Sequence, residues 1–234
     1  MTSNLRDSQD TPTGTGGTAR PATRRSSKKE ATRELILDTA ERLFAEHGIY
    51  AVSNRQIAEA AGQGNTAAVG YHFGSRADLI EAMVSRFHNS VEPAREAMLA
   101  QIAGSLNVRD WLDCQVRPIT DRFDEIGTPT WFARVGTQMM TDPELRDILM
   151  ESSFAQSPSL RASMDGLLKC LPFLPVQVQP ERVDCSMFLI IQMCAQRERA
   201  IANGEPTIRA SWSEMATGLV DMLVGVWTAP VTPV

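Results

Sequence analysis

The sequence has few of the features that mark metal-binding, secreted or membrane proteins. Its four cysteines, Cys114, Cys170, Cys185 and Cys194, are widely separated, with no Cys-x-x-Cys pair, and it has only three histidines. This excludes a structural zinc site and indicates free thiols in a reducing compartment. No apolar run approaches the ~20 residues that span a bilayer, and the polar N-terminus is unlike a secretory signal. We expect a cytoplasmic protein with no membrane association, metal or other cofactor.

Signatures of common enzymes are missing as well. The chain contains no Gly-x-Ser-x-Gly, no His-Glu-x-x-His and no Walker loop. The prediction is a protein that is not an enzyme.

The distribution of charge is uneven along the chain. The formal net charge is −5, but residues 1–76 hold ten Lys or Arg against eight Asp or Glu, whereas residues 77–234 hold thirteen against twenty. Residues 20–33 alone carry six basic side chains and one acidic one. A basic segment before an acidic body favours an anion-binding N-terminal end and a separate remainder.

Three segments are predicted. Residues 1–27, rich in Thr, Ser, Gly, Pro and Arg, have too little apolar surface to fold and should form a disordered basic arm. Residues 28–76 should form a small helical domain, and residues 77–234 a larger helical one. The only strand-like run, Val176-Gln177-Val178, is three residues long, so the fold class is all-α.

The helices follow from apolar periodicity, capping residues and glycine stops. Within the first domain they run from Lys28 to Gly48, from Ser53 to Gly62 and from Asn65 to Phe73. A fourth opens at Ser75 and is kinked or ended by Pro93. The further helices are expected at 94–104, 108–126, 129–140, 143–156, 158–170, 180–203 and 211–227.

Two short helices joined by Gly62-Gln63-Gly64 and braced by the first helix have helix-turn-helix dimensions. The third helix combines small residues with hydrogen-bond donors, and no Asp or Glu occurs between Asn65 and Phe73. A helix that lies among phosphates needs such a composition. Asn65 and Thr66 would reach deepest if the N-terminus of this helix enters the major groove.

Three segments in the same order resemble the DNA-binding domain of TetR-family transcriptional regulators. They are Ala40-Glu41-Arg42-Leu43-Phe44-Ala45-Glu46-His47-Gly48, Gln56-Ile57-Ala58-Glu59-Ala60-Ala61-Gly62 and Tyr71-His72-Phe73-Gly74-Ser75-Arg76-Ala77-Asp78-Leu79. The resemblance covers about residues 30–87. It implies an N-terminal three-helix DNA-binding domain followed by a helical ligand-binding and dimerisation domain.

The resemblance also implies residue roles. It places Tyr71 and His72 against the DNA backbone, although either could instead complete the small core. The family pattern is one residue shorter between Gly62 and Tyr71, which affects base contacts near residues 63–68. The expected DNA-contacting residues lie on the second and third helices and beside the starts of the second and fourth: Ser53, Arg55, Asn65, Thr66, Ala67, Gly70, Tyr71, His72 and Arg76.

The C-terminal part is rich in methionine and aromatic residues, which ordinarily pack in a core but can also line adaptable apolar pockets. The resemblance implies such a pocket for an apolar or amphipathic small-molecule effector. Its expected lining is Trp111, Trp131, Val135, Met139, Met187 and Ile191. Arg117, Arg122 or Arg134 could hold an acidic effector, and the sequence does not choose among them.

The last two predicted helices, 180–203 and 211–227, are apolar on more than one side. They should pack as an antiparallel hairpin and meet their symmetry mates in a four-helix homodimer interface, which includes Leu223. Burial inside a monomer is the alternative.

The sequence as a whole predicts a repressor that binds a near-palindromic operator in double-stranded DNA and is released by its effector. The alternatives are an activator or effector-independent regulator, and a helical small-molecule-binding or enzymatic protein with a vestigial helix-turn-helix.

Overall fold

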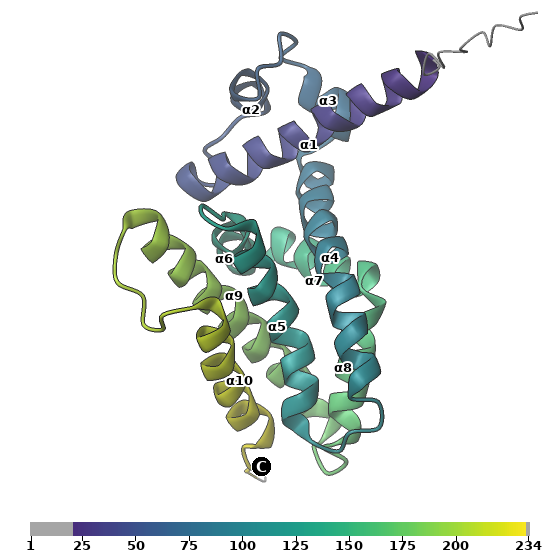
Figure 1. Cartoon of the computed structure of the whole chain (residues 1–234), viewed down its shortest axis with the longest axis vertical. Coiled ribbons are helices and arrows are strands. Elements are labelled where there is room, and N and C mark those ends of the chain that lie inside the picture. Colours follow the sequence, from purple (N-terminus) through teal and green to yellow (C-terminus); the bar gives the residue numbers. More distant parts are fainter. Residues whose placement is uncertain (1–20, 233–234) are drawn as a thin grey trace, which may run out of the picture.

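The computed structural model describes residues 21–232, and side chains from residue 26 onward. This part of the chain is all-α, as the sequence predicts, with one short 3-10 helix and no strand among the described residues. A small N-terminal unit lies on top of an elongated helical bundle (Figure 1). The helices are α1 (Pro21–His47), α2 (Asn54–Ala60), α3 (Ala68–Phe73), α4 (Arg76–Gln101), α5 (Val108–Ile126), α6 (Phe132–Thr141), α7 (Pro143–Gln156), α8 (Pro158–Lys169), η1 (Val176–Val178), α9 (Gln179–Asn203) and α10 (Trp212–Thr228).

The N-terminal unit is built by α1, α2 and α3 around one apolar core. Ser53 begins α2 through a capping box in which its hydroxyl accepts from the Gln56 amide while the Gln56 side chain accepts from the Ser53 amide. Ser75 and Asp78 form the same arrangement at the start of α4. These caps satisfy amides that the first helical turn leaves without partners. The core that they surround includes Ile36, Leu37, Phe44, Ile57, Val69, Leu79 and Ile80, all fully buried.

The first helix begins earlier than predicted. Residues 21–27, expected to belong to a disordered arm, form the start of α1, whereas residues 1–20 of that arm lie outside the described residues. Pro21 stands at the first helical position, where its missing N–H is harmless, and the alanine and arginines that follow favour a helix. The helix propensity of residues 21–27 therefore extends α1 toward the N-terminus, although their low hydrophobicity predicted a disordered arm.

Pro93 does not end α4, which runs without a break from Arg76 to Gln101 and so absorbs the helix expected at 94–104. The Pro93 ring is exposed, while Val91 and Arg95 on either side of it are fully buried. Packing of both halves in one bundle therefore outweighs the hydrogen bond that proline removes, a cost of about 3 kcal/mol.

The larger domain pairs α5 with α10 and α6 with α9. Asp142 and Ser157 cap α7 and α8, each followed by a proline at the first helical position, as the sequence indicates. Arg182 near the start of α9 donates to carbonyls at the end of α10, and Arg197 near the end of α9 donates to those of Arg209 and Ala210 just before α10. The two last helices therefore run antiparallel, although each packs mainly on another helix.

The two domains share helices. The first half of α4 lies in the N-terminal core and its second half in the bundle, and Val135, Met139 and Leu149 from α6 and α7 join the N-terminal core. Arg86 of α4 also holds α1 through ion pairs to Asp38 at 2.6 Å and Glu41 at 2.8 Å. A boundary at residues 76 and 77 stays a prediction, since the core continues across it. None of the described helices is long and apolar enough to cross a membrane.

Candidate nucleic-acid interface and internal cavity

The outer face of α3 and the turn before it are exposed and carry no carboxylate. The third helix begins at Ala68, three residues after the start at Asn65 that the sequence predicts. The Asn65 side chain accepts from the Ala67 amide at 2.9 Å, and Gly62 takes a left-handed φ of 66°. An Asx turn and a glycine in this conformation stop a helix from forming here. The turn before α3 therefore extends to Ala67 and presents Asn65, Thr66 and Ala67 to solvent.

Tyr71 and His72 occupy different environments. Tyr71 is 73% exposed, and the Lys29 ammonium lies 5.5 Å from its ring centroid. His72 is half-buried with its Nδ1 lacking a partner among the described residues. Burial, with the nearby charges of Lys29 and Arg33, lowers the pKa of His72. His72 is therefore half-buried, whereas Tyr71 points outward.

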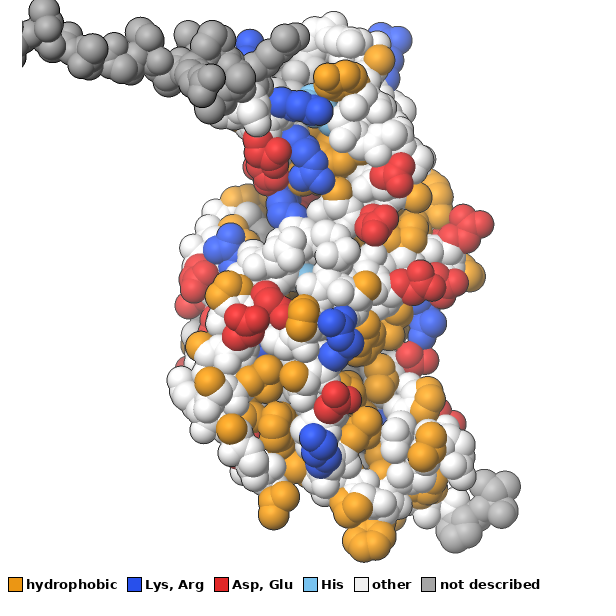
Figure 2. All heavy atoms as spheres, turned by 90° about the vertical axis from the view of Figure 1, so that its right-hand side faces the viewer, with side chains coloured by type: hydrophobic (Ala, Val, Ile, Leu, Met, Phe, Trp, Pro, Cys, Tyr) orange, Lys and Arg blue, Asp and Glu red, His pale blue; other side chains and the backbone are white. Residues whose placement is uncertain are grey.

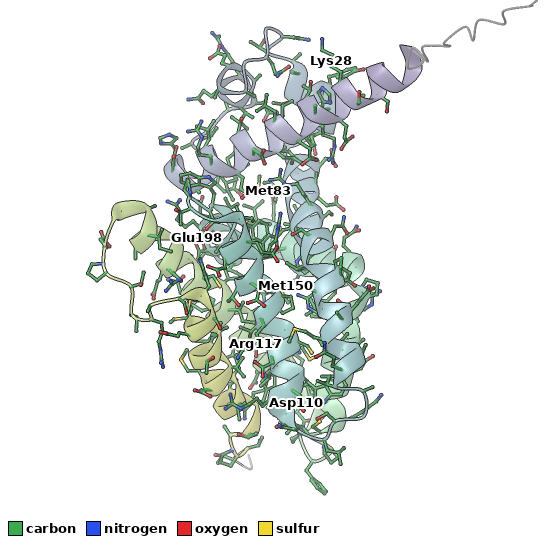
Figure 3. All side chains as sticks on the ribbon, in the orientation of Figure 1. Lys28, Met83, Asp110, Arg117, Met150 and Glu198 are labelled. Carbon is green, nitrogen blue, oxygen red and sulfur yellow. The ribbon has the colours of Figure 1, made fainter. Side chains whose placement is uncertain are left out.

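Basic side chains from α1 border this face. Lys29 lies over Tyr71 and Arg33 lies 4.9 Å from the Phe73 ring centroid. Lys28 lies on α1 in the same N-terminal part of the molecule (Figure 3), and Figure 2 shows Lys and Arg side chains gathered there beside a histidine. We define the α3 face as the exposed residues 65–67, Gly70 and Tyr71 together with Lys28 and Lys29. The predicted DNA-contacting residues did not include these two lysines, although the basic run at residues 20–33 that contains them favoured an anion-binding end.

Ser53 and Arg55 lie at the start of α2. Both are exposed, and the Arg55 guanidinium pairs with Glu59 on the next turn at 2.7 Å. An exposed ion pair of this kind contributes little to stability, so Arg55 can exchange Glu59 for another anion.

Arg76 differs from its predicted role. Its guanidinium points inward, donates to the backbone carbonyls of Ile49 and Val52, and lies 5.1 Å from the Phe44 ring centroid. Burial lowers its pKa. These contacts tie the α1–α2 connection to the start of α4, so the structure gives Arg76 a structural position rather than a place on the α3 face.

The bundle encloses a mainly apolar cavity of about 60 Å³ between α4, α5, α6, α7, α8 and α9. Its aromatic wall includes Phe87 and Phe132, whose rings stack with centroids 3.9 Å apart. The lining residues that are apolar or small come from all six helices: Phe87, Ile119, Phe123, Phe132, Ala133, Gly136, Leu149, Phe154, Leu160, Met164, Val183, Met187, Ile190, Ile191 and Cys194.

Five polar side chains interrupt this lining. The hydroxyls of Ser153 and Ser186 donate to carbonyls of their own helices. The other three, His88, Arg95 and Gln115, are 6%, 0% and 3% exposed. Each places one nitrogen, His88 Nδ1, Arg95 Nη2 and Gln115 Nε2, in a buried position with no hydrogen-bond partner among the described residues. Such groups are rare in folded proteins because each loses its hydrogen bonds to water without replacement.

The remaining nitrogens of Arg95 are occupied. Nε donates to the Cys114 carbonyl at 3.0 Å and Nη1 to the Ser157 hydroxyl at 3.0 Å, while Glu92 lies 3.6 Å away. The Glu92 carboxylate in turn accepts from Ser157 and from the Ser159 amide, and these bonds and Arg95 together lower its pKa despite burial. Burial and the Arg95 charge lower the pKa of His88 to about 4, so this imidazole is neutral at pH 7.

The predicted effector residues are only partly brought together. Met187 and Ile191 line the cavity. Trp111 lies outside it, where its indole N–H donates to the Ser105 carbonyl, and Trp131 stacks with the Arg134 guanidinium at the start of α6. Val135 and Met139 face the N-terminal core instead. Sequence periodicity identified these side chains as apolar but not the direction in which each helix faces.

The sequence singled out none of the three arginines considered for an acidic effector. Arg117 pairs with Asp113, Arg122 with Glu125, and Arg134 lies 3.9 Å from Glu198. The cavity arginine is Arg95, which sequence reasoning missed. Its position seven residues after His88 on one helix face was the available signal.

Helix α6 connects the cavity with the N-terminal unit. Its first residues line the cavity, while Gln138 near its end accepts from the Ile49 amide and donates to the Phe44 carbonyl, both at 2.8 Å. The Tyr50 hydroxyl donates to Asp142 just after α6 at 2.7 Å. Residues of α6 and its end thus contact both the cavity and the end of α1.

The helix-turn-helix, its acid-free outer face and the helical bundle define a DNA-binding protein of the helix-turn-helix class. Comparison with known proteins agrees: residues 36–83 match the family model described as bacterial regulatory proteins, tetR family. The HTH-type transcriptional regulator TtgR of Pseudomonas putida is 25% identical over 181 residues, which cover 74% of this chain and 83% of the relative.

Solved structures share the fold. The HlyIIR mutant protein superposes with a TM-score of 0.53 at 16% identity, covering 86% of this chain and 100% of the other. A candidate TetR-family transcriptional regulator from Rhodococcus sp. gives a TM-score of 0.51 at 18% identity, covering 84% and 98%. The N-terminal domain is thus similar to the DNA-binding domain of the tetR family over residues 36–83, and most of the chain is similar to a regulator of that class.

Proposed function

We propose that this protein is a ligand-responsive repressor that binds a near-palindromic operator as a homodimer and is released by a small molecule in the bundle cavity. The observation that carries the proposal is α4, one unbroken helix whose first half lies in the N-terminal core and whose second half carries His88 and Arg95 into the cavity. A rigid element with one end in each site can couple the two.

On the DNA side, the α3 face supplies the recognition surface. Asn65, Thr66, Ala67 and Gly70 are exposed and free of carboxylates, and small residues permit close approach to base edges. Tyr71, Ser53 and the exposed cations of Lys28, Lys29 and Arg55 would position the domain on phosphates. His72 would contribute through its partly exposed edge, whereas Arg76 holds the domain together.

On the ligand side, the cavity is too small for an effector in the observed state. About 60 Å³ holds little more than a few waters, while ligand pockets ordinarily reach several hundred Å³. A bound effector would therefore have to widen the space between the lining helices, α4 and α6 among them. Since Gln138 of α6 and the first half of α4 hold the N-terminal unit, this expansion would change the angle of the α3 face and lower operator affinity.

Two linked α3 faces require a dimer. The outer sides of α9 and α10 carry the exposed apolar side chains Phe188 and Met222, 50% and 43% exposed. Exposed apolar side chains on two adjacent helices favour a symmetric interface. The dimer would set the two faces about one DNA turn, roughly 34–36 Å, or a small multiple apart.

Selection of bound fragments from random duplex DNA tests the proposal. The expected result is an enriched inverted repeat whose affinity falls steeply with salt. Placed beside a promoter with a reporter gene, this repeat should give lower transcription when the protein is present. Fragments with no common sequence would contradict operator recognition, and higher transcription would identify an activator.

A further inference from the structure

We propose that the cavity selects a neutral, largely apolar molecule that presents a hydrogen-bond acceptor, such as an aromatic ketone, to Arg95 and Gln115. This inference rests on the proposed function, in which the cavity is the effector site. It adds which class of ligand the cavity accepts and which class it excludes.

The first step is the unused hydrogen-bonding capacity. Arg95 Nη2 and Gln115 Nε2 are donors, fully enclosed and unpartnered among the described residues, and both side chains line the cavity. Neither nitrogen can accept a hydrogen bond. A ligand that fills the cavity must therefore supply an acceptor to these two donors or leave them without water and without a partner.

The second step is the balance of charge. The Arg95 cation already faces the Glu92 carboxylate at 3.6 Å, and His88 beside it is a neutral ring. An anionic ligand would place a second negative charge against one positive one in a site removed from water. Buried charges of this kind are unfavourable unless they are paired, so a carbonyl satisfies the donors better than a carboxylate.

The third step is the character of the walls. Phe87, Phe123 and Phe132 form one side of the cavity, and the rings of Phe87 and Phe132 are stacked. Flat aromatic molecules pack well on such a surface. The methionines Met164 and Met187 from α8 and α9 are flexible enough to rearrange as the cavity widens.

Three small ligands of similar size separate the possibilities. Acetophenone has a ring and a carbonyl acceptor, ethylbenzene has the ring without an acceptor, and benzoate at pH 7.5 has the ring with an anionic head. Titration calorimetry on the full-length protein should give at least tenfold tighter binding of acetophenone than of either other ligand, the ratio expected from one satisfied bond to buried donors.

A matched pair of variants locates the effect. Gln115→Leu removes one donor and keeps similar volume, so it should bind ethylbenzene at least as well and lose most of the preference for acetophenone. Gln101→Leu, at the exposed end of α4, makes the same replacement away from the cavity and should keep the preference. If Gln115→Leu does not fold, the three-ligand comparison on the unaltered protein still decides.

The outcomes distinguish this inference from the proposed function. Equal affinity for acetophenone and ethylbenzene, preferential binding of benzoate, or no binding of any of the three would overturn the inference, while operator binding and selection would be unaffected. Preferential binding of acetophenone that leaves operator affinity unchanged would support the inference and contradict the effector role of the cavity.

Discussion

Tyr71 and Arg76 stand five residues apart and face opposite surroundings. The Tyr71 ring is largely in solvent beside Lys29, whereas the Arg76 guanidinium is enclosed by carbonyls of the α1–α2 connection. Both residues carry the family resemblance, so similarity alone did not separate an exposed side chain from one that supports the domain. Exposure separates them, and substitution of each should have a different consequence.

Replacement of Tyr71 by alanine should weaken operator binding by about 1–3 kcal/mol and leave the melting temperature nearly unchanged, because the removed ring is not part of the core. Fluorescence anisotropy on the selected operator and thermal unfolding measure the two effects. Leu106→Ala, at an exposed site far from the α3 face, serves as the control. A large loss of melting temperature with normal affinity would place Tyr71 in the core.

Replacement of Arg76 by methionine should lower stability by about 1.5–3 kcal/mol, since hydrogen bonds from a charged donor to two carbonyls are lost. Urea unfolding of the full chain gives this value. Operator affinity should fall only in proportion to the fraction of unfolded N-terminal unit. Unchanged stability together with a lower salt dependence of DNA binding would instead assign Arg76 to a phosphate, as the sequence predicts.

Sequence reasoning found the α3 face more completely than the cavity, for a physical reason. All the exposed residues that were predicted on the third helix and its turn lie in one segment, Asn65 to Tyr71. They could therefore be named from that segment alone. The cavity is assembled from six helices, and membership depends on how each is rotated in the bundle. Met139 and Met187 are chemically alike, but Met139 faces the N-terminal core and only Met187 faces the cavity.

At the scale of elements, α6 begins on a buried carboxylate. Glu198 of α9 accepts from the amides of Ala133 and Arg134 at 3.3 and 2.9 Å, which caps the positive end of α6. Glu198 is 2% exposed, and burial raises its pKa from 4.5 to about 7 although those amides act in the opposite direction. The position of Glu198 among the helices is shown in Figure 3. The contact fixes α6 between the cavity and the N-terminal unit.

This raised pKa makes stability depend on pH. The folded state binds the Glu198 proton more tightly than the unfolded chain, so its contribution is complete below pH 4.5 and is lost as pH rises toward about 7. The free energy of unfolding of the unaltered protein, minus that of Glu198→Gln, should therefore decrease by about 3 kcal/mol over this range.

Urea unfolding at several pH values measures that difference. His88, whose lowered pKa gives a pH dependence of opposite sign, is present in both proteins and cancels. The same replacement at exposed Glu96 serves as the control for exchanging a carboxylate for an amide away from α6. A constant difference for Glu198→Gln would mean that the carboxylate titrates in its ordinary range.

Helix boundaries were predictable where capping residues fixed them and less so elsewhere. Residues 108–126 and 143–156 were predicted with their observed limits, since Asn107 and Asp142 cap these helices through side-chain bonds. The start of α6 at Phe132 depends on Glu198 from another helix, and the sequence-based start at residue 129 was too early. A cap contributed from 64 residues away leaves no local signal.

At the scale of the whole molecule, α9 and α10 each have one side packed inside the bundle and one side in solvent. The residue predicted for the dimer interface lies on the inner side. Leu223, predicted to lie in the dimer interface, is 0% exposed and packs in the protomer core against α5 and its neighbours. The apolar stripe of α10 that contains Leu223 thus packs in the interior of the bundle. The residues left on the outside are Phe188 of α9 and Met222 of α10.

This correction changes the test of the dimer. Glu at Leu223 would unfold the protomer and give no information on association, because it places an unpaired charge in the core. Phe188→Glu and Met222→Glu introduce the charge where solvent already reaches. Together they should leave helical content and melting of the protomer close to normal and repel the symmetry mate across the interface.

Sedimentation velocity at micromolar concentration is the decisive measurement. The unaltered protein should sediment as a dimer and the Phe188→Glu/Met222→Glu protein as a monomer, with operator affinity reduced at least tenfold because one half-site supplies only part of the phosphate contacts. Leu106→Glu, at a more exposed apolar position on the α4–α5 connection, should remain dimeric. A double variant that stays dimeric, or an unaltered protein that sediments as a monomer, would place the interface elsewhere or remove it, and the spacing of the two α3 faces would then need another origin.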